Sequence, residues 1–150
     1  MNLDVLAPLP GRALPLADVP DPVFAQAMVG PGCAIDPPRG AVEAVAPVAG
    51  KIVKLHPHAY VVVGEDGRGV LVHLGLDTVQ LKGEGFRLLA EEGADVEAGT
   101  PVVAWDTAAV EAGGRSPVCP VIALDAAPEA LGGLVTSGEV VAGATLFTWE

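Results

Sequence analysis

The sequence is poor in several residue types that support particular classes of protein. It has only eight lysine and arginine residues against nineteen aspartate and glutamate residues, which gives a formal net charge of -11. Phosphate binding draws on clustered basic side chains, so we expect neither nucleic acid nor an anionic membrane as a partner. A partner protein with a basic surface would suit this charge better.

Cysteines and long hydrophobic runs are also scarce. The two cysteines, Cys33 and Cys119, cannot form a cysteine-rich metal site, and their apolar and proline neighbours predict buried free thiols. No apolar run reaches the roughly 18 residues needed to cross a bilayer. The first ten residues, MNLDVLAPLP, have neither the basic nor the continuous apolar segment of a secretory signal. We therefore expect a soluble cytoplasmic protein.

Glycine and proline, by contrast, are abundant and separate short runs of valine, isoleucine and leucine. Nineteen glycines and fourteen prolines leave little room for long helices. The apolar runs predict strands at Lys51–Leu55, Ala59–Val63, Val70–Leu74, Pro101–Trp105, Val121–Leu124 and Thr145–Trp149. This spacing favours an all-β antiparallel sandwich or barrel, with helix limited to short turns at Pro22–Met28 and within Phe86–Glu91. We expect one domain over residues 1–150.

Two segments of the chain are repeated. APLPGRALPL at Ala7–Leu16 aligns with APVAGKIVKL at Ala46–Leu55, and DVEAGTPVVAWD at Asp95–Asp106 aligns with EVVAGATLFTWE at Glu139–Glu150. Similar local patterns require similar pleat and turn geometry. The repeats therefore predict a pseudo-symmetric β fold that is duplicated within one domain.

The chain has three histidines, and one of them, His73, stands at the end of an apolar run. The dipeptide Asp66-Gly67 between this run and the preceding one predicts a two-residue hairpin turn. With that turn, Glu65 opposes Arg68, and by the same count Tyr60 opposes His73.

This register also places the other two histidines. His58 would share a sheet face with His73 as its diagonal neighbour, roughly 7 to 8 Å away by backbone. His56 falls on the same face by parity, although Pro57 disturbs a regular ladder. A register shifted by one residue would send the rings of His58 and His73 to opposite faces.

Two imidazoles on one face allow several kinds of chemistry. A neutral imidazole nitrogen is a nucleophile near neutral pH, and a second ring can donate a hydrogen bond to an anionic oxygen. The HxH pair of His56 and His58, and the HxxxD spacing from His73 to Asp77, also suit zinc. A third possibility is that each histidine is only a hydrogen-bonded structural residue.

The segments VLVHLGLDTVQLKGEGF (Val70–Phe86), HAYVV, DVPDPVFAQAMVGPGCAI and APVAGKIVKL together resemble the glucose-type IIA component of the bacterial phosphoenolpyruvate-dependent sugar phosphotransferase system. The resemblance runs from about Val5 to Trp149, with the motifs in family order. It implies a β-sandwich of the duplicated-hybrid-motif type. It also implies a phosphotransferase component that works through a phosphohistidine, without a required cofactor or metal.

The resemblance assigns roles to individual residues. His73 matches the acceptor, whose Nε2 takes a phosphoryl group from the histidine-containing phosphocarrier protein and passes it to a cysteine of the IIB domain of a sugar transporter. His58 matches the second active-site histidine, which stabilises the phosphoryl group. The backbone carbonyl of Gly75 would orient the ring of His73. Zinc binding by His58 and His73 would be incidental.

The resemblance further implies a docking surface for partner proteins. Its apolar members are Pro22, Val23, Phe24, Leu71 and Val79, and its acidic members are Asp21 and Asp77, which would meet an arginine of the phosphocarrier protein. Some of the apolar residues, Leu71 and Val79 first, are equally consistent with core positions. No IIB or IIC segment accompanies the chain, so we expect a separate transporter; regulatory protein targets are also compatible with the family.

One residue departs from the family pattern. The family commonly has threonine two residues before the second histidine, where this chain has His56. A third imidazole could replace the hydrogen bond of that hydroxyl, strengthen zinc binding, or do neither.

Two other classes share parts of these patterns. Zinc peptidases of related β architecture use HxxxD and HxH ligands, but in the opposite order along the chain. Lipoyl and biotinyl carrier modules resemble APVAGKIVKL, but they modify a lysine in a different context, and Lys82 in LKGEG is better interpreted as a solvated loop lysine.

Overall fold

The chain folds almost entirely into short strands. Residues 2–150 are described by a computed structural model, and its strands are β1 Leu3–Leu6, β2 Gly11–Pro15, β3 Gly32–Asp36, β4 Ala41–Val45, β5 Gly50–His56, β6 Ala59–Val63, β7 Gly69–His73, β8 Phe86–Leu88, β9 Asp95–Val96, β10 Pro101–Asp106, β11 Cys119–Ala123, β12 Leu131–Gly132, β13 Glu139–Val140 and β14 Thr145–Trp149. The helical segments are α1 Pro22–Ala25, α2 Thr107–Ala112 and the 3-10 turns η1 Leu16–Asp18, η2 Thr78–Leu81 and η3 Pro128–Ala130. The predicted all-β class is confirmed.

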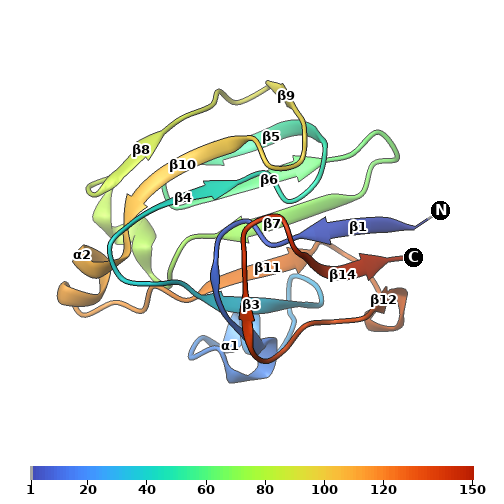
Figure 1. Ribbon diagram of the computed structural model, residues 1–150, viewed down its shortest axis with the longest axis horizontal. Helices are drawn as coiled ribbons and strands as arrows, with labels where there is room; N and C mark the ends of the chain where they lie inside the picture. The colour runs from blue at the N-terminus through green and yellow to red at the C-terminus, as the bar shows by residue number, and fades with distance from the viewer. Residues whose placement is uncertain (1) are drawn as a thin grey trace.

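The strands form one large sheet and two small ones (Figure 1). The large sheet has the order β13-β2-β3-β11-β7-β6-β5-β9, and the small sheets have the orders β1-β14-β12 and β4-β10-β8. All pairings are antiparallel. The histidine-bearing strand β7 lies next to β11 at the centre of the large sheet.

The sheet order is itself symmetric, as the repeats predict. In one half Gly50 pairs with Val96 and Lys51 with Asp95; in the other half Gly11 pairs with Val140 and Arg12 with Glu139. Both glycines begin a strand at a close backbone approach: an added Cβ would lie 2.1 Å from the Val63 oxygen at Gly50 and 2.3 Å from the Asp36 oxygen at Gly11. The same tight geometry requires glycine in both repeats.

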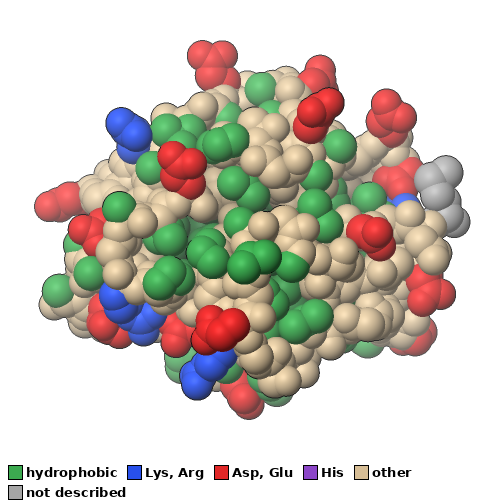
Figure 2. All heavy atoms as spheres, viewed as in Figure 1, with side chains coloured by type: hydrophobic (Ala, Val, Ile, Leu, Met, Phe, Trp, Pro, Cys, Tyr) green, Lys and Arg blue, Asp and Glu red, His purple; other side chains and the backbone are tan. Residues whose placement is uncertain are grey.

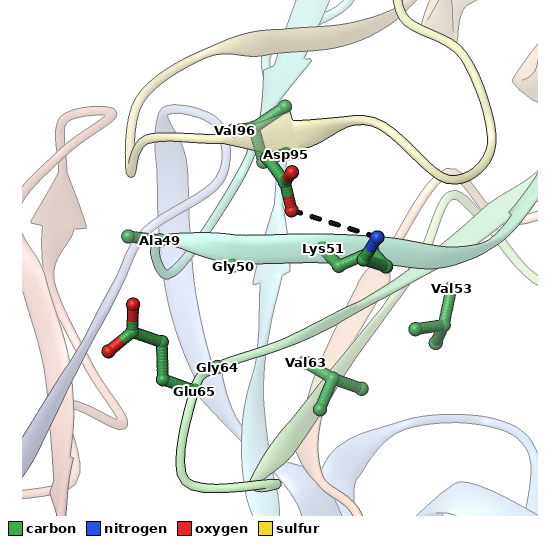
Figure 3. Close-up of a pocket in the computed structure, with 9 residues that line it drawn as sticks. All are labelled: Ala49, Gly50, Lys51, Val53, Val63, Gly64, Glu65, Asp95 and Val96. Carbon is green, nitrogen blue, oxygen red and sulfur yellow. Dashed lines mark ion pairs between the residues drawn. The ribbon is translucent and has the colours of Figure 1, made fainter.

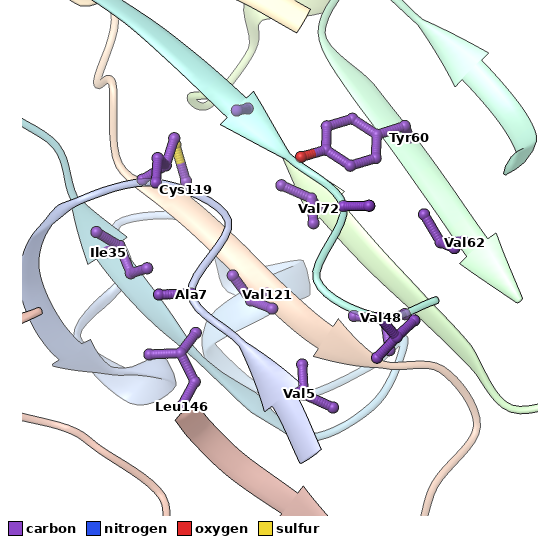
Figure 4. Packing of buried hydrophobic residues seen from close by; sticks show 14 of the residues in the cluster. Val5, Ala7, Ile35, Val48, Tyr60, Val62, Val72, Cys119, Val121 and Leu146 are labelled. Carbon is purple, nitrogen blue, oxygen red and sulfur yellow. The ribbon is translucent and has the colours of Figure 1, made fainter. Parts of the chain in front are cut away.

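The main core fills the space between the large sheet and the two small sheets (Figure 4). It draws Val5 from β1, Tyr60 and Val62 from β6, Val72 from β7 and Val121 from β11. Tyr60 is fully buried, and its hydroxyl donates to the backbone carbonyl of Val45 at 2.6 Å. Burying a tyrosine in this way is tolerated because its one polar group has a partner.

A second, smaller cluster lies on the outer face of the large sheet. It joins Leu16, Val19 and Phe24, from the connection between β2 and β3, to sheet and loop residues that include Ile122 and Leu76. The long connection that carries η1 and α1 therefore covers part of the outer face. This cluster forms one border of the candidate site.

Two details of the predicted elements change. The turn predicted within Phe86–Glu91 is wrong, because Phe86–Leu88 forms β8 and pairs with β10. The ring of Phe86 stacks on Trp105 at 5.4 Å between centroids, a tertiary contact that the local sequence does not reveal. The helical turn at Pro22–Met28 is present but shorter, at Pro22–Ala25. Cys33 and Cys119 are buried and free, as predicted.

Candidate functional site

Two histidine rings meet where strand β7 ends. His73 is the last residue of β7, and His58 lies in the tight turn between β5 and β6. Their ring centroids are 5.4 Å apart in an edge-on arrangement. The backbone N–H of Leu74 donates to the carbonyl of His58 at 2.7 Å, so the two segments are also joined through the backbone.

The rings meet for a reason that differs from the predicted one. The predicted register is wrong by one residue, because Ala59, and not Tyr60, opposes His73. The connection from Val63 to Gly69 is a five-residue loop, closed by a hydrogen bond from Gly64 N–H to the Arg68 carbonyl at 3.0 Å.

Strand parity does not apply to His58, since it lies in a turn and not in a strand. The backbone of the turn directs its ring toward His73. The predicted proximity of the two rings is therefore confirmed, although the predicted register is not.

The ring of His73 is oriented by the loop that follows it. Its Nδ1 lies 2.6 Å from the backbone oxygen of Gly75, and a carbonyl can only accept a hydrogen bond. Nδ1 therefore carries a proton, and the lone pair of the neutral ring is on Nε2. Gly75 reaches this position with a φ of +78°, in the left-handed region that favours glycine.

Burial lowers the pKa of both histidines. For His73 burial is the main cause, and it is opposed by the hydrogen bond to Gly75 and by the charges of Asp21 and Asp77. For His58 burial again comes first, followed by the positive charges of His73 and His56. Both rings therefore stay neutral down to a lower pH than the ring of an exposed histidine would. Near neutral pH each ring thus has a nitrogen with a free lone pair.

The third histidine is stacked on the outside of the pair. The ring of His56 lies 5.6 Å from that of His58 at an interplanar angle of 22°, and its side chain is exposed. Among residues 2–150, no hydrogen bond joins these two side chains. His56 therefore does not reproduce the hydrogen bond expected of a threonine hydroxyl; it contacts His58 through its ring face.

Apolar and acidic side chains surround the pair. The ring of Phe24 packs against His73 at 5.2 Å between centroids, and Phe24 itself is buried. Val23 and Val79 are 42% and 58% exposed, so neither is a core residue. The remaining residues of the predicted docking surface are Pro22 and Asp77, which are exposed, and Leu71 and Asp21, which are half-buried.

Asp21 and α1 set the position of Phe24. The carboxylate of Asp21 caps the helix by accepting from the N–H of Val23 at 3.0 Å, and Pro22 occupies the first helical position. Both features are typical of a helix start. The short segment DPVF thereby orients one aromatic ring toward His73 while leaving Val23 exposed.

Sequence reasoning missed one residue of the site. Thr78 is only 1% exposed, and its hydroxyl donates to the carbonyl of Leu74 at 2.7 Å. A signal was present in HLGLDT, because a threonine shortly after a loop glycine commonly bonds to nearby backbone.

The site lies on an open surface, away from the main hollows. A hollow of about 510 Å³ between β5, β6 and β9 is crossed at its rim by the ion pair of Lys51 and Asp95, 3.9 Å apart (Figure 3). A second hollow of about 540 Å³ is lined by Gly11, Arg12 and Val140, the symmetry equivalents of Gly50, Lys51 and Val96. The two hollows thus lie at equivalent positions in the two repeats.

The face drawn in Figure 2 shows no histidine; hydrophobic side chains lie near its centre and acidic ones are scattered over it. Within residues 2–150, the structure brings together no group of three or more histidine, cysteine, aspartate or glutamate side chains that could hold a metal ion. In the same range, no helix has both the length and the apolar character needed to cross a membrane.

Comparison with known proteins identifies the family. Residues 3–128 match the family described as phosphoenolpyruvate-dependent sugar phosphotransferase system, EIIA 1. The chain is 42% identical, over 81% of its length and 73% of the relative, to the PTS system glucose-specific EIIA components of Staphylococcus epidermidis and of Oceanobacillus iheyensis. The glucose permease IIA from Mycoplasma capricolum matches the structure with a TM-score of 0.92 at 35% identity, covering 100% of this chain and 97% of that one.

This protein therefore belongs to the EIIA 1 family and is a phosphotransferase component of the sugar phosphotransferase system. The predicted resemblance is confirmed. The comparisons support neither the zinc-peptidase nor the lipoyl and biotinyl alternative. Lys82 is an exposed loop residue, as predicted.

Proposed function

We propose that His73 accepts a phosphoryl group on Nε2 and passes it on. The observation that carries the proposal is the 2.6 Å contact between Nδ1 of His73 and the Gly75 oxygen. It holds the proton on Nδ1 and leaves the Nε2 lone pair as the nucleophile. The lowered pKa of His73 supports the same state, because a protonated ring has no lone pair to donate.

The transfer is an in-line displacement at phosphorus. The bond from phosphorus to the donor histidine breaks as the bond to Nε2 of His73 forms, and the donor nitrogen keeps the electron pair of the broken bond. The onward step repeats this with a cysteine thiolate as nucleophile and the nitrogen of His73 as leaving group. Such reactions depend mainly on positioning and on stabilising charge on the phosphoryl oxygens.

His58 is suited to stabilise that charge. Its ring centroid is 5.4 Å from that of His73, and a neutral imidazole has one N–H to donate to a phosphoryl oxygen. The apolar side chains of Phe24, Val23 and Val79 would exclude water once a partner is seated. Neither step requires a metal or another cofactor.

The proposed partners follow from the family and from the surface. The donor is the histidine-containing phosphocarrier protein, and the acceptor is the IIB domain of a separate sugar transporter. Exposed Val23 and Val79 offer an apolar contact, and Asp21 and Asp77 offer carboxylates to a basic partner. The names of the relatives point to glucose as the sugar, and the proposed location is the cytoplasm. Regulatory partners on the same surface are compatible with this arrangement.

The test is phosphorylation with purified upstream proteins. The protein is incubated with phosphoenolpyruvate, enzyme I and the phosphocarrier protein, and intact mass is measured. We expect one acid-labile phosphoryl group that is absent in His73→Ala. In His58→Ala the group should form, but its transfer to a IIB domain should slow by roughly a hundredfold, the loss typical of removing one donor to a developing charge.

A matched variant is His56→Ala, which removes the outer imidazole and should keep the label. Label that persists in His73→Ala would exclude His73 as the acceptor. A wild-type protein that takes no label from an upstream system shown to be active on another IIA component would contradict the proposed function as a whole.

A further inference from the structure

The Gly75 carbonyl must be held in place outside any regular element. Strand β7 ends at His73, so the sheet ladder no longer fixes the chain beyond it. Gly75 and Asp77 both adopt left-handed conformations, with φ values of +78° and +58°. These dihedral angles alone do not fix the Gly75 oxygen at 2.6 Å from Nδ1 of His73. Contacts with neighbouring segments must therefore hold it there.

Besides an interaction between the backbone N–H of Gly75 and the thiol of Cys119, three hydrogen bonds hold this loop. Leu74 N–H donates to the His58 carbonyl at 2.7 Å, and Leu76 N–H donates to the Ser116 carbonyl at 2.8 Å. Both join backbone to backbone, so they do not depend on side-chain identity. The third runs from the hydroxyl of Thr78 to the carbonyl of Leu74 at 2.7 Å, and it depends on one side chain.

Thr78 touches the loop from a second side as well. A Cβ added to Gly75 would lie 2.7 Å from Cγ2 of Thr78, so the methyl group packs directly against this glycine. The side chain is 1% exposed, and its β-branched form restricts rotation about χ1. The hydroxyl thus holds Leu74, and the methyl group packs against Gly75, the residue whose carbonyl orients the ring of His73.

We propose that Thr78 is a positioning residue, which holds the Gly75 carbonyl against Nδ1 of His73 and thereby keeps Nε2 as the unprotonated nitrogen. Thr78 does not touch the phosphoryl group; it acts through Gly75. The effect of Thr78 on phosphoryl transfer rests on the proposed function of His73. Its effect on the tautomer of the His73 ring is independent of that function.

The test compares two substitutions at one position. Thr78→Val keeps the shape and removes the hydroxyl, whereas Thr78→Ser keeps the hydroxyl and removes the methyl group. The tautomer and the pKa of His73 are followed by ring ¹⁵N chemical shifts in a pH titration. The rate of phosphorylation by the phosphocarrier protein is measured on the same samples.

In Thr78→Val we expect a mixture of tautomers in place of Nδ1–H alone. We also expect a lower pKa of His73, since the hydrogen bond to Gly75 raises it, and a phosphorylation rate reduced roughly five- to tenfold. Thr78→Ser keeps the hydroxyl and loses only the methyl contact, so it should be impaired much less than Thr78→Val in all three. If Thr78→Val does not fold, the comparison of Thr78→Ser with Thr78→Ala replaces it, with the same expected difference.

Two results would overturn the proposal. One is a single Nδ1–H tautomer in the folded variant without the hydroxyl; the other is equal impairment of the variants with and without it. Because the tautomer is measured without any phosphoryl donor, a failure of His73 as acceptor would abolish the rates in wild type and leave this readout intact.

Discussion

At the scale of single residues, Gly75 combines a left-handed backbone with close neighbours. An alanine Cβ at Gly75 would meet Cγ2 of Thr78 at 2.7 Å and the Ser116 oxygen at 3.0 Å, in addition to the strain of a positive φ. We expect Gly75→Ala to lower the free energy of unfolding by about 3 kcal/mol and to slow phosphorylation of His73. Chemical denaturation and the labelling assay measure the two effects.

A matched control exists in the same region of the chain. Gly85 has a φ of +86°, but an added Cβ would meet no atom within 4 Å. Gly85→Ala should therefore cost only about 1 kcal/mol, the strain of the backbone alone. Equal destabilisation by the two substitutions would show that the contacts around Gly75 have no effect.

The third histidine permits a test of electrostatics in the site. The pKa of His58 is lowered by burial and then by the charges of His73 and His56. Replacing His56 with threonine removes one of these positive charges, so the pKa of His58 should rise toward its ordinary value. His56→Lys keeps a positive charge at every relevant pH and should lower it further. NMR titration of the His58 ring distinguishes the two, and no difference between them would contradict the stacked arrangement.

At the scale of elements, the loop between β6 and β7 is tied to the last strand. Arg68 donates to the Trp149 carbonyl at 2.6 Å, and its guanidinium lies 5.6 Å from the centre of the Trp149 ring. It also pairs with Asp66 in the same loop, an exposed contact that contributes little. One side chain thereby links the hairpin that carries His73 to β14.

Arg68→Ala should lower the free energy of unfolding by about 2 kcal/mol, from the lost hydrogen bond and the lost stacking. Lysine should not restore it, because lysine lacks the planar fork that serves both contacts. Arg87→Ala is the control, because the exposed side chain of Arg87 makes no hydrogen bond or ion pair within residues 2–150; it should change stability by less than about 0.5 kcal/mol. Thermal or urea denaturation gives the comparison.

The same loop shows what the sequence could and could not predict. Asp66-Gly67 predicts a two-residue turn, but the carboxylate of Asp66 accepts from the N–H of Arg68 and stabilises a longer loop instead. Arg68 of this loop also contacts Trp149, 81 residues away along the chain, and a local sequence pattern does not contain such a contact. The register of a hairpin is therefore harder to predict than its existence.

At the scale of the whole molecule, the repeats predicted most of the architecture. They succeeded because the close backbone approaches at Gly11 and Gly50 require the same residue twice, and that requirement is visible in sequence. They could not predict the site, which breaks the symmetry. Thr78 and the left-handed Asp77 follow the end of β7 in a connection that no repeat marks.

The two halves of the molecule differ at the positions of the two histidines. In one half, Leu74 N–H donates to the His58 carbonyl; in the other, Ala123 N–H donates to the Pro31 carbonyl. His58 thus corresponds to Pro31, and His73, next to Leu74, corresponds to Ile122, next to Ala123. Ile122 is fully buried, whereas His73, at the end of β7, is half-buried.

The difference comes from two connections of unequal length. Between β2 and β3 the chain makes η1 and α1, which cover Ile122; between β5 and β6 it makes only the turn of Pro57 and His58. The duplicated fold has two equivalent positions, and the longer connection covers the one that holds Ile122. If His73 is the acceptor, as proposed, the connection between β2 and β3 leaves one of the two equivalent positions open to a partner protein.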